Sequence, residues 1–175
     1  SIMVNLDMKN PVIEEDYTRH IMLNTIRSIK MKFGEDYGQL VLCSDNKNYW
    51  RKRAFPYYKV RRKLDQKESK IDWNDLFRVL NKFKIELKEI FPYKFVEVDH
   101  AEADDIIGTL AEDYGTTLPV ATNEPILIVS GDKDFIQLQK YTNVVQYDTV
   151  RKRWIKDPDP THYLYVHLLK GDAGD

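Results

Sequence analysis

The sequence has little of the features that would place it in several common classes of protein. Cys43 is its only cysteine, which excludes a disulfide framework and favours a reducing compartment. No apolar run approaches the roughly 18 residues that a membrane-spanning helix needs, and there is no internal repeat or low-complexity segment. Of its 175 residues, 42% are hydrophobic and 31% are charged, the composition of a globular domain with a core.

Neither sign of charge prevails in the total, but the charges are segregated along the chain. Residues 47–70 contain ten lysines and arginines against two acids, a net charge of +8. Residues 99–134 contain nine acids against one lysine, a net charge of −8. Such segregation suits a domain that holds a polyanion on one surface and cations on another. Two solvated surfaces would give the same totals, so composition leaves both interpretations open.

Apolar periodicity predicts helices alternating with short strands. The predicted helices are 14–33, 73–90 and 103–114, and the predicted strands are 39–44, 94–98, 126–129 and 144–147. Asp72 is placed to cap the second helix, and Gly34 and Gly115 are placed to end the first and the third. This alternation predicts an α/β fold, a parallel sheet flanked by helices, with residues 151–154 as a hairpin edge.

Some parts of this pattern carry more specific expectations. The basic segment 46–70 has no lasting apolar period, so we expect a loop there, or helices that order only on a ligand. The apolar side of helix 73–90 includes Phe77 and Ile90, and helix 103–114 is expected to turn Tyr114 inward.

Acidic residues follow the predicted strands one after another. In an open parallel sheet, ligands gather beyond the carboxyl ends of the strands. Asp45 and Glu102 follow the first two strands, and Asp132 follows the third. Further acids lie close by or after the last helical stretch, and the full set is Asp45, Glu102, Asp104, Asp105, Asp132, Asp134, Asp172 and Asp175.

The spacing of these acids suggests which of them point together. Glu102 and Asp105 are three residues apart at a helix start and can project from one face, with Asp104 rotated away into an outer shell. Asp132 and Asp134 point the same way if their strand stays extended. Taken singly, each piece has an ordinary explanation: acids favour helix N-termini, and Asp-x-Asp is common in turns.

Converging carboxylates repel one another unless cations neutralise them. Carboxylate oxygens without His or Cys partners select hard ions, Mg²⁺ or Mn²⁺, over Zn²⁺. Two such ions about 4 Å apart can activate a water and steady the leaving oxygen of a phosphodiester. The acidic set therefore predicts a metal-dependent phosphodiesterase, with the basic segment as its nucleic-acid contact.

Five segments together resemble those of the 5′-nuclease superfamily of flap endonucleases, and within it the T-even-phage RNase H and 5′-3′ exonuclease type. They occur in the family's order and approximate spacing over residues 39–175: LVLCSDN, YWRKRAFPYYKVRR, EADD, IVSGDKDFIQL and LLKGDAGD. The resemblance implies a PIN-like, resolvase-like α/β fold in which 46–70 forms a basic arch. It also implies one catalytic domain over 1–175, with the family's first strand and its helix–hairpin–helix module expected to lie outside this chain.

The resemblance further implies roles for particular residues. The eight acids would bind two Mg²⁺ ions, for which Mn²⁺ can substitute. Lys59 and Arg62 would be catalytic and face the scissile phosphate. The residues implied in nucleic-acid binding are Arg51, Arg53, Tyr57, Tyr58 and Arg61. The four histidines match no family position and are interpreted as structural.

The resemblance also implies a biological setting. The substrates would be RNA primers and DNA 5′ flaps, that is, DNA and RNA–DNA with free 5′ ends, processed during replication. The protein would act as a monomer in the cytoplasm of a bacterium or phage-infected bacterium, with a single-stranded-DNA-binding protein and a sliding clamp as partners and no membrane.

Other classes fit less of the sequence. A PIN-type ribonuclease shares the acid-edged sheet but usually lacks a long basic arch. A haloacid-dehalogenase phosphatase requires DxDxT, whereas Phe135 and Ile136 follow Asp134. A receiver-type signalling domain does not explain the basic segment. A catalytically silent nucleic-acid-binding fragment is the non-enzymatic alternative.

Overall fold

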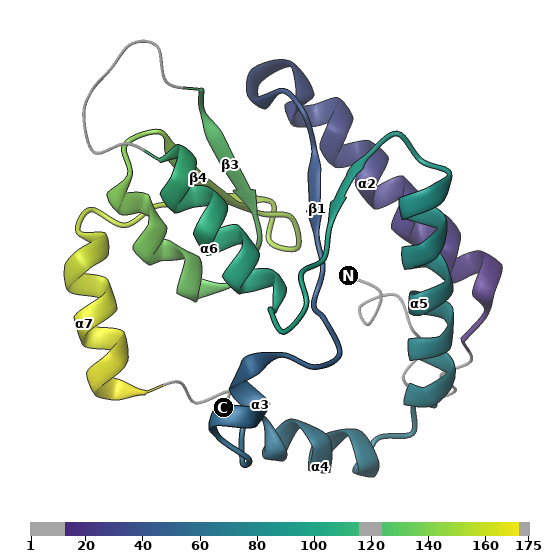
Figure 1. Cartoon of the computed structure of the whole chain (residues 1–175). Helices are drawn as coiled ribbons and strands as arrows, with labels where there is room; N and C mark the ends of the chain where they lie inside the picture. The colour runs from purple at the N-terminus through teal and green to yellow at the C-terminus, as the bar shows by residue number, and fades with distance from the viewer. Residues whose placement is uncertain (1–12, 116–123, 172–175) are drawn as a thin grey trace. The chain divides into compact units, whose positions relative to one another are not determined.

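The computed structural model describes residues 13–115 and 124–171 and has a mixed α/β architecture (Figure 1). The chain divides into two compact units. The first comprises Ser1–Leu42 with Arg51–Val96, and the second comprises Cys43–Trp50 with Glu97–Asp175. None of the helices in the described ranges is both long and apolar enough to cross a membrane.

The first unit is built on two long helices, α2 (Glu15–Tyr37) and α5 (Trp73–Glu89), which contact each other. The Asp72 side chain accepts a hydrogen bond from the Asp75 N–H, 3.0 Å away, and so caps α5 as predicted. The apolar side chains buried in this unit are Phe33, Ile71, Leu76, Val79, Phe83 and Leu87. Arg19 of α2 forms an ion pair with Glu86 of α5.

Three expectations for this unit were wrong in detail. Helix α2 continues through Gly34 and ends at Gly38, whose positive φ of 69° suits a glycine and whose N–H bonds the Gly34 carbonyl. Phe77 and Ile90 of the α5 region are 46% and 71% exposed, because the buried stripe runs through Val79 instead.

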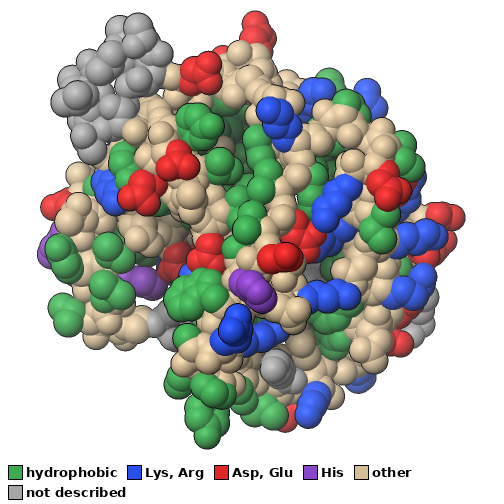
Figure 2. All heavy atoms as spheres, viewed as in Figure 1, with side chains coloured by type: hydrophobic (Ala, Val, Ile, Leu, Met, Phe, Trp, Pro, Cys, Tyr) green, Lys and Arg blue, Asp and Glu red, His purple; other side chains and the backbone are tan. Residues whose placement is uncertain are grey.

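The basic segment contains helices, which was one of the two alternatives expected for it. They are α3 (Trp50–Ala54) and α4 (Val60–Glu68). Neither has a buried residue among the side chains described. Lysine and arginine side chains lie over α3, α4 and α5 on the face seen in Figure 2.

The second unit contains a three-stranded sheet with helices packed against it. Strand β3 (Ile126–Val129) pairs in parallel with β4 (Val144–Asp148), which pairs antiparallel with β5 (Arg153–Ile155). The 151–154 segment is therefore a hairpin edge, as predicted. Helix α6 (Ala103–Tyr114) and the 3₁₀ helix η1 (Lys133–Lys140) contact each other, and α7 (Pro160–Lys170) packs against η1.

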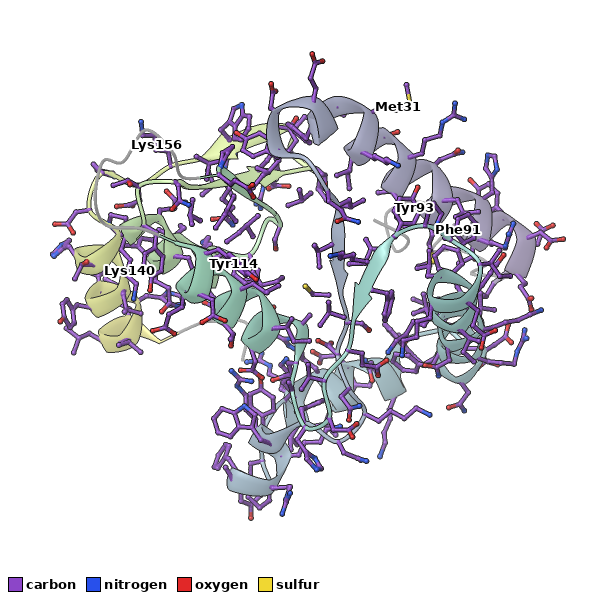
Figure 3. The ribbon with its side chains drawn as sticks, turned by 45° about the horizontal axis from the view of Figure 1, so that its top comes forward. Met31, Phe91, Tyr93, Tyr114, Lys140 and Lys156 are labelled. Atoms are coloured by element: carbon purple, nitrogen blue, oxygen red, sulfur yellow. The ribbon has the colours of Figure 1, made fainter. Side chains whose placement is uncertain are left out.

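The core of the second unit lies between the sheet and these helices. Ala111, Ile128, Phe135 and Val144 form a buried cluster, against which Ile107 packs. The expected inward position of Tyr114 was wrong. This residue, labelled in Figure 3, is 71% exposed, because Ala111 takes the buried position in the last turn.

The expected parallel sheet is seen in part, as the parallel pair of β3 and β4. Strand β1 (Val41–Cys43) pairs with β2 (Lys94–Val96) in a two-stranded sheet. Alternation along the chain predicts strands and helices, but it does not specify which strands share backbone hydrogen bonds.

Candidate active site

Three of the predicted acids meet at the N-terminus of α6. Glu102 is the N-cap residue, and its side chain accepts from the Asp105 N–H. Asp105 Oδ2 accepts from the Glu102 N–H at 2.9 Å, which completes a capping box. Asp45 Oδ1 accepts from the Ala103 N–H at 2.7 Å. The unpaired amides and positive dipole end of a helix explain why carboxylates gather there.

The segment that carries Asp45 is tied to the start of α6 by its backbone. The Asn46 N–H donates to the Ala101 carbonyl at 3.0 Å, and the Trp50 N–H donates to the His100 carbonyl at 2.8 Å. His100 adopts a positive φ of 66°, and its Nδ1 lies 2.8 Å from the Asn48 carbonyl oxygen. These contacts bring Asp45, which is 58 residues from Ala103, to the EADD box.

Asp105 also has a partner that the sequence did not suggest. The indole N–H of Trp50 donates to Asp105 Oδ2 at 3.3 Å. Asp104 lies in the same first turn of α6.

Asp132 and Asp134 lie at the start of η1, just beyond the end of β3. Asp132 is the N-cap residue, and its Oδ1 accepts from the Asp134 N–H at 3.0 Å. The two side chains were expected to point the same way if the strand stayed extended. The strand does not continue, because the chain turns into η1 at Lys133. His167 of α7 places its Nε2 3.2 Å from Asp134 Oδ1. This histidine, interpreted from the sequence as merely structural, therefore contacts a candidate ligand.

Two buried polar residues of β4 lie beside this turn. Gln146 is 0% exposed and Asp148 is 2% exposed. The backbone N–H of Arg151 holds the pKa of Asp148 below its usual value, helped by the Val150 N–H and the Arg151 side chain. Sequence reasoning singled out neither residue.

The predicted nucleic-acid residues belong to the basic segment of the first unit. Arg51 and Arg53 lie in α3, and Arg61 and Arg62 in α4. Lys59 precedes α4 in a left-handed conformation (φ 55°, ψ 27°) that non-glycine residues adopt infrequently.

Two aromatic contacts lie next to one another in the sequence of this segment, one of them with Lys59. The Lys59 Nζ lies 4.9 Å from the ring centroid of Tyr58. Tyr57 is 73% exposed, and its ring meets that of Phe55 edge to face at 5.8 Å.

The donor chemistry of the acidic set fits a hard divalent ion, because carboxylate oxygens prevail. Within 13–115 and 124–171, however, no group of three or more His, Cys, Asp or Glu side chains is arranged so that it could hold a metal. The carboxylates at α6 bond the helix N–H groups instead. Asp172 and Asp175 lie outside the described residues. The metal site stays a prediction.

Comparison with known proteins gives a consistent result. A family model described as the 5′-3′ exonuclease, N-terminal resolvase-like domain matches residues 12–162. Ribonuclease H of Enterobacteria phage T4 is 36% identical over 162 residues, which are 90% of this chain and 52% of that protein. A 5′-3′ exonuclease of Buchnera aphidicola is 29% identical over 166 residues, 88% of this chain and 52% of that protein. The chain thus spans about half the length of these curated relatives.

Solved structures share the fold. The 5′-exonuclease of phage T5 with bound divalent zinc ions has a TM-score of 0.63 and 19% identity, over 90% of this chain and 59% of that one. A pseudo-enzyme–product complex of a phage T5 flap endonuclease with DNA and metal ions has a TM-score of 0.66 and 18% identity, again over 90% and 59%.

Proposed function

The chain belongs to the family of 5′-3′ exonuclease N-terminal resolvase-like domains, and we propose that it hydrolyses phosphodiesters at 5′ ends and 5′ flaps by metal-dependent catalysis. The observation that carries this proposal is the meeting of Asp45 with the EADD box at the N-terminus of α6. The helix N-terminus accounts for the position of these carboxylates, and their oxygens are also the ligands that a hard divalent ion prefers. Membership of the family supports this second role.

The proposed substrates follow from the named relatives. The phage T4 relative is a ribonuclease H, and a phage T5 structure of the same fold holds DNA and metal ions. We therefore assign RNA primers and DNA 5′ flaps, with free 5′ ends, to this chain. Replication in a bacterium or phage-infected bacterium is the matching setting, with a monomeric enzyme and with a single-stranded-DNA-binding protein and a sliding clamp as partners.

The metal ligands in this proposal are the acids around α6 and η1 together with Asp172 and Asp175. Bound Mg²⁺ would supply an activated water and charge neutralisation at the leaving oxygen. The chain's contribution is to hold the carboxylates in place beforehand. Asp105 is fixed by the Glu102 N–H and the Trp50 indole, and Asp45 is fixed by the Ala103 N–H. Binding an ion would redistribute these hydrogen bonds.

The basic segment supplies the proposed contacts to the substrate. Lys59 and Arg62 are assigned to the scissile phosphate, where positive charge stabilises the transition state. The left-handed backbone at Lys59 supports a special role for this position, because such conformations cluster at functional sites. Arg51, Arg53 and Arg61 are assigned to the backbone phosphates, and the exposed Tyr57 with Tyr58 to stacking on bases.

The metal assignment is tested with a double variant, and a second double variant in the same local motif is its control. Asp132→Asn with Asp134→Asn should abolish Mn²⁺ binding in calorimetry, because it removes two charges and retains the turn. Asp157 and Asp159 form the same local motif, with the Asp159 N–H 2.9 Å from Asp157 Oδ1, and neither is a candidate ligand. Asp157→Asn with Asp159→Asn should therefore leave Mn²⁺ binding unchanged.

The outcomes separate the alternatives. Unchanged Mn²⁺ affinity in the Asp132/Asp134 variant would place the site elsewhere, and equal losses in both variants would indicate non-specific attraction of cations. Cleavage of a 5′-labelled flap with Mg²⁺ supports the proposal. Binding of the flap and of Mn²⁺ without cleavage would instead support a silent nucleic-acid-binding protein. Cleavage of single-stranded RNA regardless of its 5′ end would favour a PIN-type ribonuclease.

A further inference from the structure

The turn that carries Asp132 and Asp134 is fastened to β4 by a fully buried amide. Gln146 is 0% exposed, and its Nε2 donates to the carbonyl oxygens of Ser130 at 2.9 Å and of Asp132 at 2.6 Å. These two carbonyls flank Gly131, at the point where the chain leaves β3. Strands β3 and β4 lie side by side (Figure 1). In their register Ile128 is opposite Gln146.

The orientation of this amide is fixed by a second glutamine. Gln139 Nε2 donates to Gln146 Oε1 and to the Ile155 carbonyl, both at 3.2 Å, and Gln139 Oε1 accepts from the Asp157 N–H at 3.1 Å. The nitrogen of each side-chain amide thus faces acceptors and its oxygen faces a donor, so only one orientation of each amide satisfies the network. Among the described residues, no buried side-chain nitrogen or oxygen lacks a hydrogen-bond partner.

Asp148 restricts the same turn through its contact with Gly131. A Cβ at Gly131 would lie 3.1 Å from Asp148 Cγ and Oδ2, closer than ordinary van der Waals contact. The backbone of the turn therefore passes directly over the carboxyl group of Asp148, while Gln146 binds the carbonyls on either side. Both contacts come from β4, a rigid element in the core of the second unit.

We propose that Gln146 is a positioning residue that holds Asp132 and Asp134 in one arrangement for binding of a divalent cation. The inference rests on the proposed function. Two carboxylates on an unrestrained turn repel each other, so the turn would adopt other conformations, and the free-energy cost of restraining it when the ion binds would weaken that binding. A buried amide that fixes the backbone on both sides of Gly131 removes that cost before the ion binds. Residues that orient metal ligands typically change metal affinity by about 10- to 100-fold when replaced.

The test compares two buried substitutions on the same strand. Gln146→Met keeps the approximate size of the side chain and removes both donors. Val144→Ala removes apolar contacts in the core cluster, in which Val144 is 4% exposed, but leaves the turn bonds intact. Gln146→Met should weaken Mn²⁺ binding in calorimetry by about tenfold or more. Val144→Ala should lower the melting temperature and keep the Mn²⁺ affinity of the unsubstituted chain.

Hydrogen exchange of single amides, measured by NMR without metal, gives a second readout. The Asp132 N–H donates to Ser130 Oγ at 3.1 Å and the Asp134 N–H to Asp132 Oδ1, so both amides report the geometry of the turn. They should exchange faster in Gln146→Met and at unchanged rates in Val144→Ala. If Gln146→Met does not fold, Gln146→Asn replaces it. Its shorter amide cannot reach both carbonyls, and the same two changes are expected.

Equal Mn²⁺ affinities in the unsubstituted chain and Gln146→Met, or equal losses in Gln146→Met and Val144→Ala, would overturn the inference. If the unsubstituted chain binds no Mn²⁺, the proposed metal site is wrong. Hydrogen exchange alone then tests whether Gln146 fixes the turn. Faster exchange at Asp132 and Asp134 would then support the role of Gln146 in fixing the turn, and unchanged exchange would reject it.

Discussion

Substitutions of Asp45 distinguish most clearly between a side chain that only caps a helix and one that also binds a metal ion. Its Oδ1 accepts from the Ala103 N–H at 2.7 Å, and the side chain is exposed. Removing such a cap costs about 1 kcal/mol, which in a domain of this size lowers the melting temperature by roughly 2–4 °C. We therefore expect a loss of this size for Asp45→Ala without metal. Asp45→Asn keeps an acceptor oxygen and should lose less than half as much.

When metal is added, Asp45→Ala and Asp45→Asn should behave alike in the rise of their melting temperatures. At an Mn²⁺ concentration one hundred times the Kd, binding to the folded state adds about 2.7 kcal/mol of stability. The melting temperature of the unsubstituted chain should then rise by roughly 5–11 °C. Both Asp45 variants should lose most of this rise, because neither retains the carboxylate charge. Differential scanning calorimetry with and without Mn²⁺ measures all of these quantities.

Asp72→Asn is the matched control. Asp72 caps α5 through the Asp75 N–H at 3.0 Å and is not a candidate ligand, so this variant should retain the full Mn²⁺-dependent rise. A rise in Asp45→Asn equal to that of the unsubstituted chain would refute the reasoning and leave Asp45 as a helix cap only.

The other predictions concern pH, proteolysis and substrate handling. The pKa of Asp148 is lowered in the folded state, so its contribution to stability is present above the unfolded value of about 3.9 and is lost as pH falls through the folded value. The difference in melting temperature between the unsubstituted chain and Asp148→Asn should shrink on acidification through that range, and a constant difference would contradict the assignment. Trypsin should first cut within 47–70, where α3 has no buried residue, whereas first cuts within α5 would count against this. In single-turnover assays on a 5′ flap, Lys59→Ala should slow cleavage about a hundredfold with little change in binding, and loss of affinity alone would make the segment a tether. Arg51→Ala should instead weaken binding and reduce its salt dependence by roughly one unit of slope, which salt titrations measure.

Local signals were sufficient where neighbouring residues set an element's boundaries. The apolar run 126–129 coincides with β3, and Asp72 caps α5 as predicted. Helix α6 runs from Ala103 to Tyr114, as its periodicity indicated. These are short-range effects of capping, turn formation and side-chain period. The same local reasoning failed at Gly34, because α2 continues past it and the chain adopts its positive φ at Gly38, where the helix ends.

The sequence predicted that Asp45 and the EADD box lie together, but not how their carboxylates are bonded. Asp45 and the EADD box were expected together because both follow strands, and the structure places Asp45 at the start of α6. The partners of the acids were not predictable. Trp50 lies 55 residues from Asp105, His167 lies 33 residues from Asp134, and Gln146 lies 16 residues from Ser130. No periodicity or motif connects residues at such distances along the chain.

The sequence by itself determined the element types, the segregation of charge and the acids of the candidate site, because these depend on composition and on spacing within a few residues. Only the tertiary structure decided which strands pair, since hydrogen bonding between strands depends on packing across the whole unit. It also decided that Gln146 is buried beneath the turn that carries Asp132. A glutamine in a strand has no intrinsic preference for that position, and the partners that satisfy its amide come from η1 and from the turn before it.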